Sequence, residues 1–145
     1  MESKTRNSLL IGIVGMAIAL LYFGQIYFGA SDADGSQSVS NPVPEGFVVP
    51  DFNRVQLAGQ IAFEANCQVC HGQFGLGTNK GPPFMNEIYA PPIHADGAFV
   101  FAVAQGSQQH HWNFGNMPAI AGVSDDEVIA ITAYVRALQS ANGYE

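Results

Sequence analysis

Residues 67–71 read Cys67-Gln68-Val69-Cys70-His71, and this stretch decides how the rest of the chain is interpreted. The spacing C-x-x-C-H is the attachment signature of a c-type haem. Two cysteines on one helical turn can each form a thioether to a haem vinyl group, and the adjoining histidine is then held at the iron. The motif therefore predicts one haem c, bound covalently through Cys67 and Cys70, with His71 as an axial ligand of the iron.

Other uses of paired cysteines fit the chain less well. A structural zinc site needs four ligands, and the chain has no cysteine beyond Cys67 and Cys70. A thioredoxin-like dithiol needs a strand-helix-strand context, whereas the residues before Cys67 have a helical pattern. A spacing of three residues also argues against a structural disulfide.

Apolar residues are concentrated near the N-terminus. Residues 9–30 contain 17 hydrophobic residues out of 22, and no charge occurs between Arg6 and Asp32. A helix of that length is about 33 Å long, enough to cross a hydrocarbon core of about 30 Å. We expect residues 9–30 to be a transmembrane anchor. A cleaved signal peptide is the alternative, although Phe28-Gly29-Ala30 is a poor cleavage site and only a weaker one follows Ser31.

The charges are distributed unevenly along the chain. Lys4 and Arg6 precede the apolar segment, so the positive-inside rule predicts residues 1–8 in the cytoplasm and the remainder on the periplasmic or extracytoplasmic side of the cytoplasmic membrane. After residue 30 there are 11 acidic and three basic residues. This acidic balance disfavours nucleic acid as a partner, because binding to phosphates needs a basic surface.

Residues 31–53 separate the apolar segment from the rest of the chain. They are first polar and rich in glycine and serine, and then contain Pro42, Pro44 and Pro50. This composition predicts a flexible linker that stiffens toward its end. Alternatively, residues 47–49 (Phe-Val-Val) pack on the following domain as an extended arm.

Residues 54–145 have the pattern of a small all-α domain. Helical periodicity occurs over residues 55–65, and over 96–105, where Phe99, Val100 and Val103 form an apolar stripe. Ser124 and Glu127 form a capping box that opens a C-terminal helix. A short turn is expected near residues 84–89, and no run alternates as a strand would.

A second axial ligand is expected downstream of His71. The candidates are Met85, His94, His110, His111 and Met117. Met117 is favoured because it lies in a turn rich in glycine and proline, residues 115–118, which can hold its side chain rigidly toward the iron. Met85 follows His71 by only 14 residues, a short path around the porphyrin edge.

From about Arg54 to Gln139 the sequence resembles a class I cytochrome c. The matching features, in order, are Gly59 and Phe63 before the haem motif, Gly81-Pro82-Pro83-Phe84 after it, the Met117 turn, and Ile131 to Val135 in the last helix. The resemblance implies that the Pro82 carbonyl accepts the Nδ1 hydrogen of His71, and that Gly59 permits a close crossing of the first and last helices. Phe84 in place of an aliphatic residue, the second proline and the lack of surface lysines depart from the family pattern.

His110-His111-Trp112 precede the Met117 turn. We expect Trp112 to contact the haem, with its indole N–H donating to a propionate, because a buried indole needs an acceptor. For His110 and His111, a solvated loop and a role at the haem edge that couples potential to pH are both open. A copper site formed by the paired histidines is the least favoured alternative.

These features predict a membrane-anchored one-electron carrier rather than an enzyme, because iron ligated by both His71 and Met117 has no open position for a substrate. The resemblance implies redox partners in respiratory or photosynthetic membranes, such as a quinol-cytochrome c reductase and a terminal oxidase. No small-molecule substrate is expected. The main alternative is a permanent haem c subunit of a multi-subunit dehydrogenase or oxidase, and a gas sensor or peroxidase with open iron is less favoured.

Overall fold

The computed structural model describes residues 38–145. The predicted cytoplasmic segment 1–8, the anchor 9–30 and the first residues of the predicted linker lie outside the described residues. Within the described part, no helix has both the length and the apolar character needed to cross a membrane.

The described part of the chain is helical, as predicted. The α-helices are α2 (Arg54–Asn66), α3 (Gln68–His71), α4 (Asp96–Gln105) and α5 (Asp125–Ala141), with short 3-10 turns at Gln73–Gly75 and Glu87–Tyr89. Between residues 38 and 145 the only β pairing consists of two isolated bridges, Ser40 with Thr78 and Ser107 with Met117. The predicted helices and the predicted turn near residues 84–89 are therefore present.

Local sequence signals set the ends of the two long helices. Ser124 and Glu127 form the predicted capping box of α5, with the Ser124 amide donating to Glu127 Oε2 over 2.8 Å. Hydrogen bonds from Ser124 lower the pKa of Glu127. Helix α2 has a second capping box, formed by Asn53 and Gln56, which the sequence analysis did not identify. These caps satisfy backbone N–H groups that have no partner within the helix.

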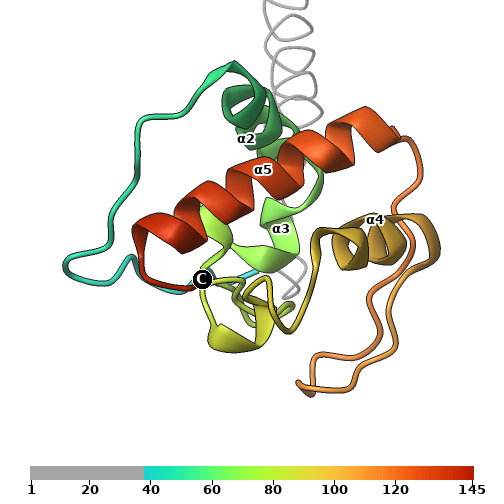
Figure 1. Cartoon of the computed structure of the whole chain (residues 1–145). Coiled ribbons are helices and arrows are strands. Elements are labelled where there is room, and N and C mark those ends of the chain that lie inside the picture. Colours follow the sequence, from blue (N-terminus) through green and yellow to red (C-terminus); the bar gives the residue numbers. More distant parts are fainter. Residues whose placement is uncertain (1–37) are drawn as a thin grey trace, which may run out of the picture. The chain divides into compact units, whose positions relative to one another are not determined.

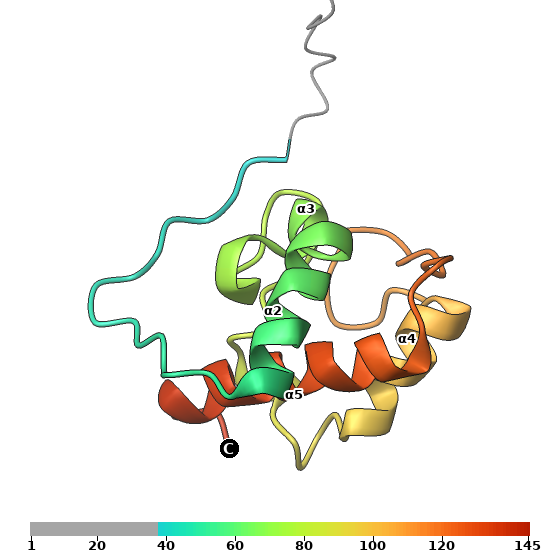
Figure 2. The same cartoon turned by 90° about the horizontal axis from the view of Figure 1, so that it is seen from above.

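Helices α2 and α5 cross closely, and this crossing forms the centre of the domain (Figures 1 and 2). A Cβ atom on Gly59 would lie 1.9 Å from the Ala130 carbonyl oxygen, so no other residue fits there without moving a helix. Beside the crossing, Phe63 and Tyr134 are fully buried, with ring centroids 5.5 Å apart. The helix contact that the resemblance implied is present.

Residues 38–53 lie along the helical domain (Figure 2). Asn41 donates from Nδ2 to the Leu76 carbonyl, and Asn142 Nδ2 donates to the Val48 carbonyl, each over 2.8 Å. The Phe47 ring stacks on Phe74 with centroids 5.7 Å apart. Of the two expectations for residues 47–49, the structure has the packed arm, although the side chains of Val48 and Val49 remain about half exposed.

Helix α4 has no fully buried residue. The apolar stripe of Phe99, Val100 and Val103 is present along this helix, but each of the three is only half-buried. Phe99 lies at a cavity, described below, rather than entirely within the protein core.

We predict that Gly59→Ala lowers the free energy of unfolding by about 3 kcal/mol, because the added methyl collides with the backbone of α5. Chemical denaturation of the purified protein measures this loss. Gly97→Ala is the matched control, since a Cβ at Gly97 meets nothing within 4 Å and alanine raises helix propensity by at most ~1 kcal/mol. Equal stability of the two variants would contradict a tight crossing at Gly59.

Candidate haem-binding site

The His71 ring is held in one orientation from two sides. Its Nδ1 lies 3.0 Å from the Pro82 carbonyl oxygen, and its ring stacks on Phe84 with centroids 4.2 Å apart. Because a carbonyl can only accept, Nδ1 carries the proton and Nε2 keeps its lone pair. Burial lowers the pKa of His71, and the Pro82 hydrogen bond opposes that effect. The ring is therefore neutral and ready to bind a metal through Nε2.

A network of backbone contacts positions Pro82 opposite His71. The Thr78 hydroxyl donates to the Cys70 carbonyl over 2.5 Å and accepts from the Lys80 amide over 2.9 Å. The Thr78 amide donates to the Gly81 carbonyl over 3.0 Å. Thr78 is buried, and it ties the loop that carries Pro82 to the turn that carries the cysteines. No sequence motif singled out Thr78, because its role depends on the folded path of the loop.

Two polar residues of α5, neither of which was predicted from the sequence, hold residues 84–96. Gln139 is fully buried and donates from Nε2 to the carbonyls of Phe84 and Tyr89. Arg136 donates to the carbonyls of Tyr89 and His94 and forms a salt bridge of 2.7 Å with Asp96. Residues 84–96 are thereby fixed to α5. The available signal was two long polar side chains, three residues apart, beside the apolar residues Val135 and Leu138 in the second half of the helix.

The two cysteines lie on the helical turn that leads to His71. The Cys70 amide donates to the Cys67 carbonyl over 3.1 Å, and both residues are half-buried. Burial, and secondly the neighbouring Cys70, raises the pKa of the Cys67 thiol to about 11. Before haem attachment, Cys67 is therefore a neutral thiol at neutral pH, unlike the thiolates of dithiol oxidoreductases.

A cavity of about 890 Å³ adjoins the His71 ring. Its walls come from the Pro82 loop, from α4 and from the loop of residues 105–117, and they include His71, Phe99, Trp112 and Met117. The structure thus brings Met117 to the same cavity as His71. Met85, the other methionine candidate, is instead packed in the protein core beside Phe63 and Tyr134, so it is not placed as an iron ligand.

The Met117 turn is anchored to the end of α4. Ser107 and Met117 exchange two backbone hydrogen bonds of 2.9 Å. Gly106 ends α4 with a φ of +78°, and a Cβ there would lie 2.6 Å from the Met117 carbonyl oxygen. A glycine is therefore required for this close approach. The result is a rigid backbone that holds the Met117 side chain at the cavity.

Trp112 supplies a test of whether the cavity suits a haem. Its Nε1 is buried, yet it makes no hydrogen bond with any described residue. Burial raises the pKa of Tyr89, and an interaction of its hydroxyl with the Trp112 indole opposes that rise. The indole and the hydroxyl do not, however, reach hydrogen-bond geometry. A buried donor without an acceptor is costly. A ligand with a carboxylate at the cavity would satisfy it, so the residues present fit a haem.

Three histidines also lie at this cavity. His110 and His111, whose role was left open, are exposed on the loop before Met117, and His94 joins them from the segment before α4. No sequence pattern indicated that His94 would lie beside His110 and His111.

The sequence profile of the cytochrome c family matches residues 56–139. The chain belongs to the cytochrome c family. Its cofactor is haem c, bound covalently, and Cys67 and Cys70 are the cysteines of its C-x-x-C-H motif. The family functions in electron transfer, to which the haem iron contributes a reversible one-electron change.

Among solved structures, this cytochrome is similar in fold to the c-type cytochrome XoxG from Methylobacterium extorquens AM1. The TM-score is 0.50 and the sequence identity is 23%, over 64% of this chain and 56% of that chain. The chain thus matches little more than half the length of that protein. No curated protein matches the chain.

If Met117 is the second ligand of the haem iron, Met117→Ala would leave the iron with a position open to small ligands. Carbon monoxide then binds the ferrous protein at neutral pH, and the reduction potential falls by a substantial part of the roughly 0.8 V range that axial ligands control. Optical titration and redox potentiometry measure both effects. Met85→Ala is the control: it costs about 2–5 kcal/mol of stability through lost core packing but leaves the iron closed. Carbon monoxide binding by the wild type would contradict ligation by Met117.

Replacing Trp112 with phenylalanine tests the unpartnered N–H. If the indole donates to a haem propionate, Trp112→Phe leaves that carboxylate less neutralised, which stabilises the ferric state and lowers the reduction potential. Stability should change little, because the ring volume is largely kept. A potential identical to that of the wild type at several salt concentrations would show that the indole has no such role.

Proposed function

We propose that this cytochrome is a one-electron carrier whose iron is ligated by His71 and Met117. The observation that carries the proposal is that both side chains lie at one cavity, His71 fixed by Pro82 and Met117 fixed by its pairing with Ser107. Two protein ligands leave no iron position for a substrate. The protein therefore transfers electrons and does not act as an enzyme on a small molecule.

Methionine ligation favours the ferrous state and gives a raised potential. Such a carrier suits donors that oxidise quinols and acceptors that reduce oxygen, in a respiratory or photosynthetic membrane. The acidic balance of the chain, with a formal net charge of −7, suits a partner with a basic docking face.

We further propose that residues 9–30 anchor the protein in the cytoplasmic membrane, with residues 1–8 in the cytoplasm and the haem domain on the periplasmic or extracytoplasmic side. The support is the uncharged apolar composition of residues 9–30 and the basic residues Lys4 and Arg6 before them. The anchor restricts diffusion to the membrane plane and raises the effective concentration of the haem domain at membrane partners.

The packing of residues 38–53 on the domain limits how far an anchored haem domain can move. Only residues 31–37 then remain as a tether, and seven residues reach at most about 25 Å when fully extended. A tether of that length keeps an anchored haem domain within reach of partners embedded in the same membrane.

Fractionation of the native host tests the membrane assignment. The intact haem protein should stay with the membranes through washes with high salt and be released only by detergent, and external protease should digest the haem domain in cells stripped of their outer layers. A soluble haem protein that begins after residue 31 would instead establish a cleaved signal peptide. Recovery in a stoichiometric complex that is stable in salt would establish a fixed subunit rather than a carrier.

A further inference from the structure

We propose that His94, His110 and His111 form a second metal site, which binds one divalent transition-metal ion of the kind that imidazole prefers, such as Zn²⁺ or Cu²⁺. The chain has four histidines, and these are all of them apart from His71. Between residues 38 and 145 they form the only group of three or more His, Cys, Asp or Glu residues whose ligand atoms converge, all lying within 4.8 Å of one another.

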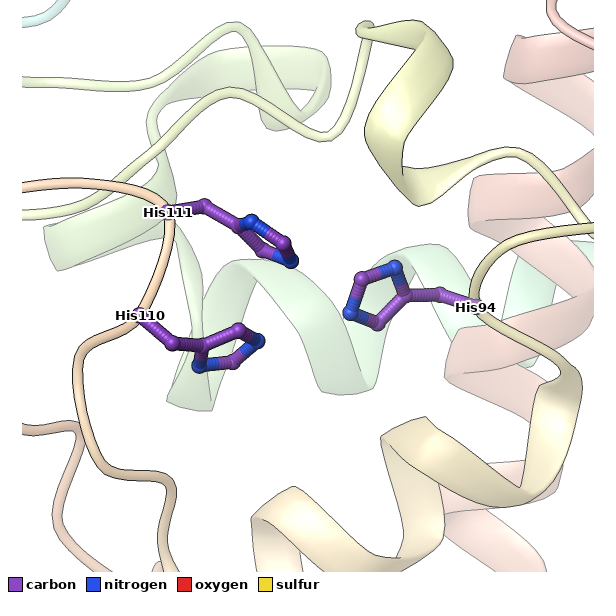
Figure 3. A group of neighbouring side chains, drawn as sticks. All are labelled: His94, His110 and His111. Carbon is purple, nitrogen blue, oxygen red and sulfur yellow. The ribbon is translucent and has the colours of Figure 1, made fainter.

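Figure 3 shows the three rings pointing toward one another from two different segments. His110 and His111 come from the loop before Met117, and their ring centroids are 4.1 Å apart. The His94 ring faces them from the segment before α4, with its centroid 5.3 Å from that of His111 and 6.0 Å from that of His110. An ion among them would join residues that are far apart in the sequence.

Hydrogen bonds to backbone carbonyls already orient two of the rings. His94 Nδ1 bonds to the Ile88 carbonyl, and His110 Nδ1 lies 2.7 Å from the Gln108 carbonyl. Since carbonyls only accept, each Nδ1 carries the proton and each Nε2 presents a lone pair. A bond of this kind, from the second ring nitrogen to a carbonyl, is what metal-binding histidines usually make.

The surroundings suit a cation at this position. Burial, and then the neighbouring His110 and His94, lower the pKa of His111. Arg136 bonds to the His94 carbonyl, and its positive charge is paired with Asp96. The chain as a whole is acidic.

The rings need only a small adjustment to bind. Zinc-nitrogen bonds of about 2.0–2.1 Å place tetrahedral ligand atoms roughly 3.3 Å apart, which is closer than the present limit of 4.8 Å. His110 and His111 are exposed on a loop and can move inward, whereas His94 is held by Ile88 and through Arg136. Three imidazoles leave the fourth position to water or another ligand.

The position of this site links it to the haem. All three histidines line the cavity that also holds His71 and Met117. A divalent charge in the wall of that cavity favours the ferrous over the ferric haem, because the reduced group carries one positive charge fewer. Metal binding should therefore raise the reduction potential, so that the carrier responds to the available transition metal.

Titration of the full-length haem protein in detergent tests the proposal. Copper(II) is added to the ferric protein, so that no electron passes to the copper, and binding is followed by electron paramagnetic resonance. We expect one copper ion per protein, with hyperfine coupling to imidazole nitrogens. His110→Gln and His111→Gln should each weaken binding by more than the roughly 10–100-fold that the loss of a second-shell partner causes. Asn113→Ala, an exposed change in the same loop, should leave binding unchanged.

The redox-inert ion Zn²⁺ provides a second measurement. Saturating Zn²⁺ should compete with copper and raise the reduction potential of the wild type, but not that of His111→Gln. Because the haem is bound covalently through Cys67 and Cys70, the His110 and His111 variants keep it, which the optical spectrum verifies. The proposal is overturned if the haem protein takes up no copper, or if copper binds equally well to the double variant His110→Gln/His111→Gln.

Discussion

The whole site depends on holding one imidazole in one tautomer. The hydrogen bond from His71 Nδ1 to the Pro82 carbonyl decides which ring nitrogen is free, and it also fixes the plane of the ring. Because His71 follows Cys70 directly, the backbone that carries the haem attachment also sets the direction of the ligand. A loop that placed Pro82 elsewhere would leave His71 buried without a hydrogen-bond partner. The loop between His71 and Pro82 must therefore be held in one conformation by other contacts.

That support reaches from the haem turn to the last helix. Thr78 ties the loop to Cys70, and the buried Gln139 of α5 holds the Phe84 carbonyl two residues after Pro82. Helix α5 is in turn packed closely against α2 at Gly59. Helix α2 ends directly before Cys67. The helix crossing therefore does more than bury apolar surface. It sets the distance between the segment that carries the cysteines and the helix that positions the proline loop.

Local patterns predicted much of this structure, and contacts between distant residues account for most of what they missed. The helices, the cap at Ser124 and the close approach at Gly59 followed from spacing or from the family resemblance. Arg136 and Gln139 were missed because their partners lie 40 to 55 residues away, and no period in a sequence reports such pairs. The meeting of His94 with His110 and His111 has the same origin, since it depends on how Arg136 holds the His94 segment. The apolar stripe of α4 did not indicate that Phe99 would lie at a cavity, because a helical period does not distinguish a protein core from a cofactor cavity.

The cavity brings together two kinds of metal-binding side chain, a methionine on an anchored turn and three histidines that face one another. We propose that the methionine binds the haem iron and that the histidines bind a separate ion. X-ray absorption at the iron edge of the intact haem protein tests this division most directly. We expect the spectrum to show a sulfur atom bound to the iron. This sulfur should be lost in Met117→Ala and kept when His94, His110 or His111 is replaced. An iron shell composed of nitrogen alone, or one that changes when His94, His110 or His111 is replaced, would contradict it.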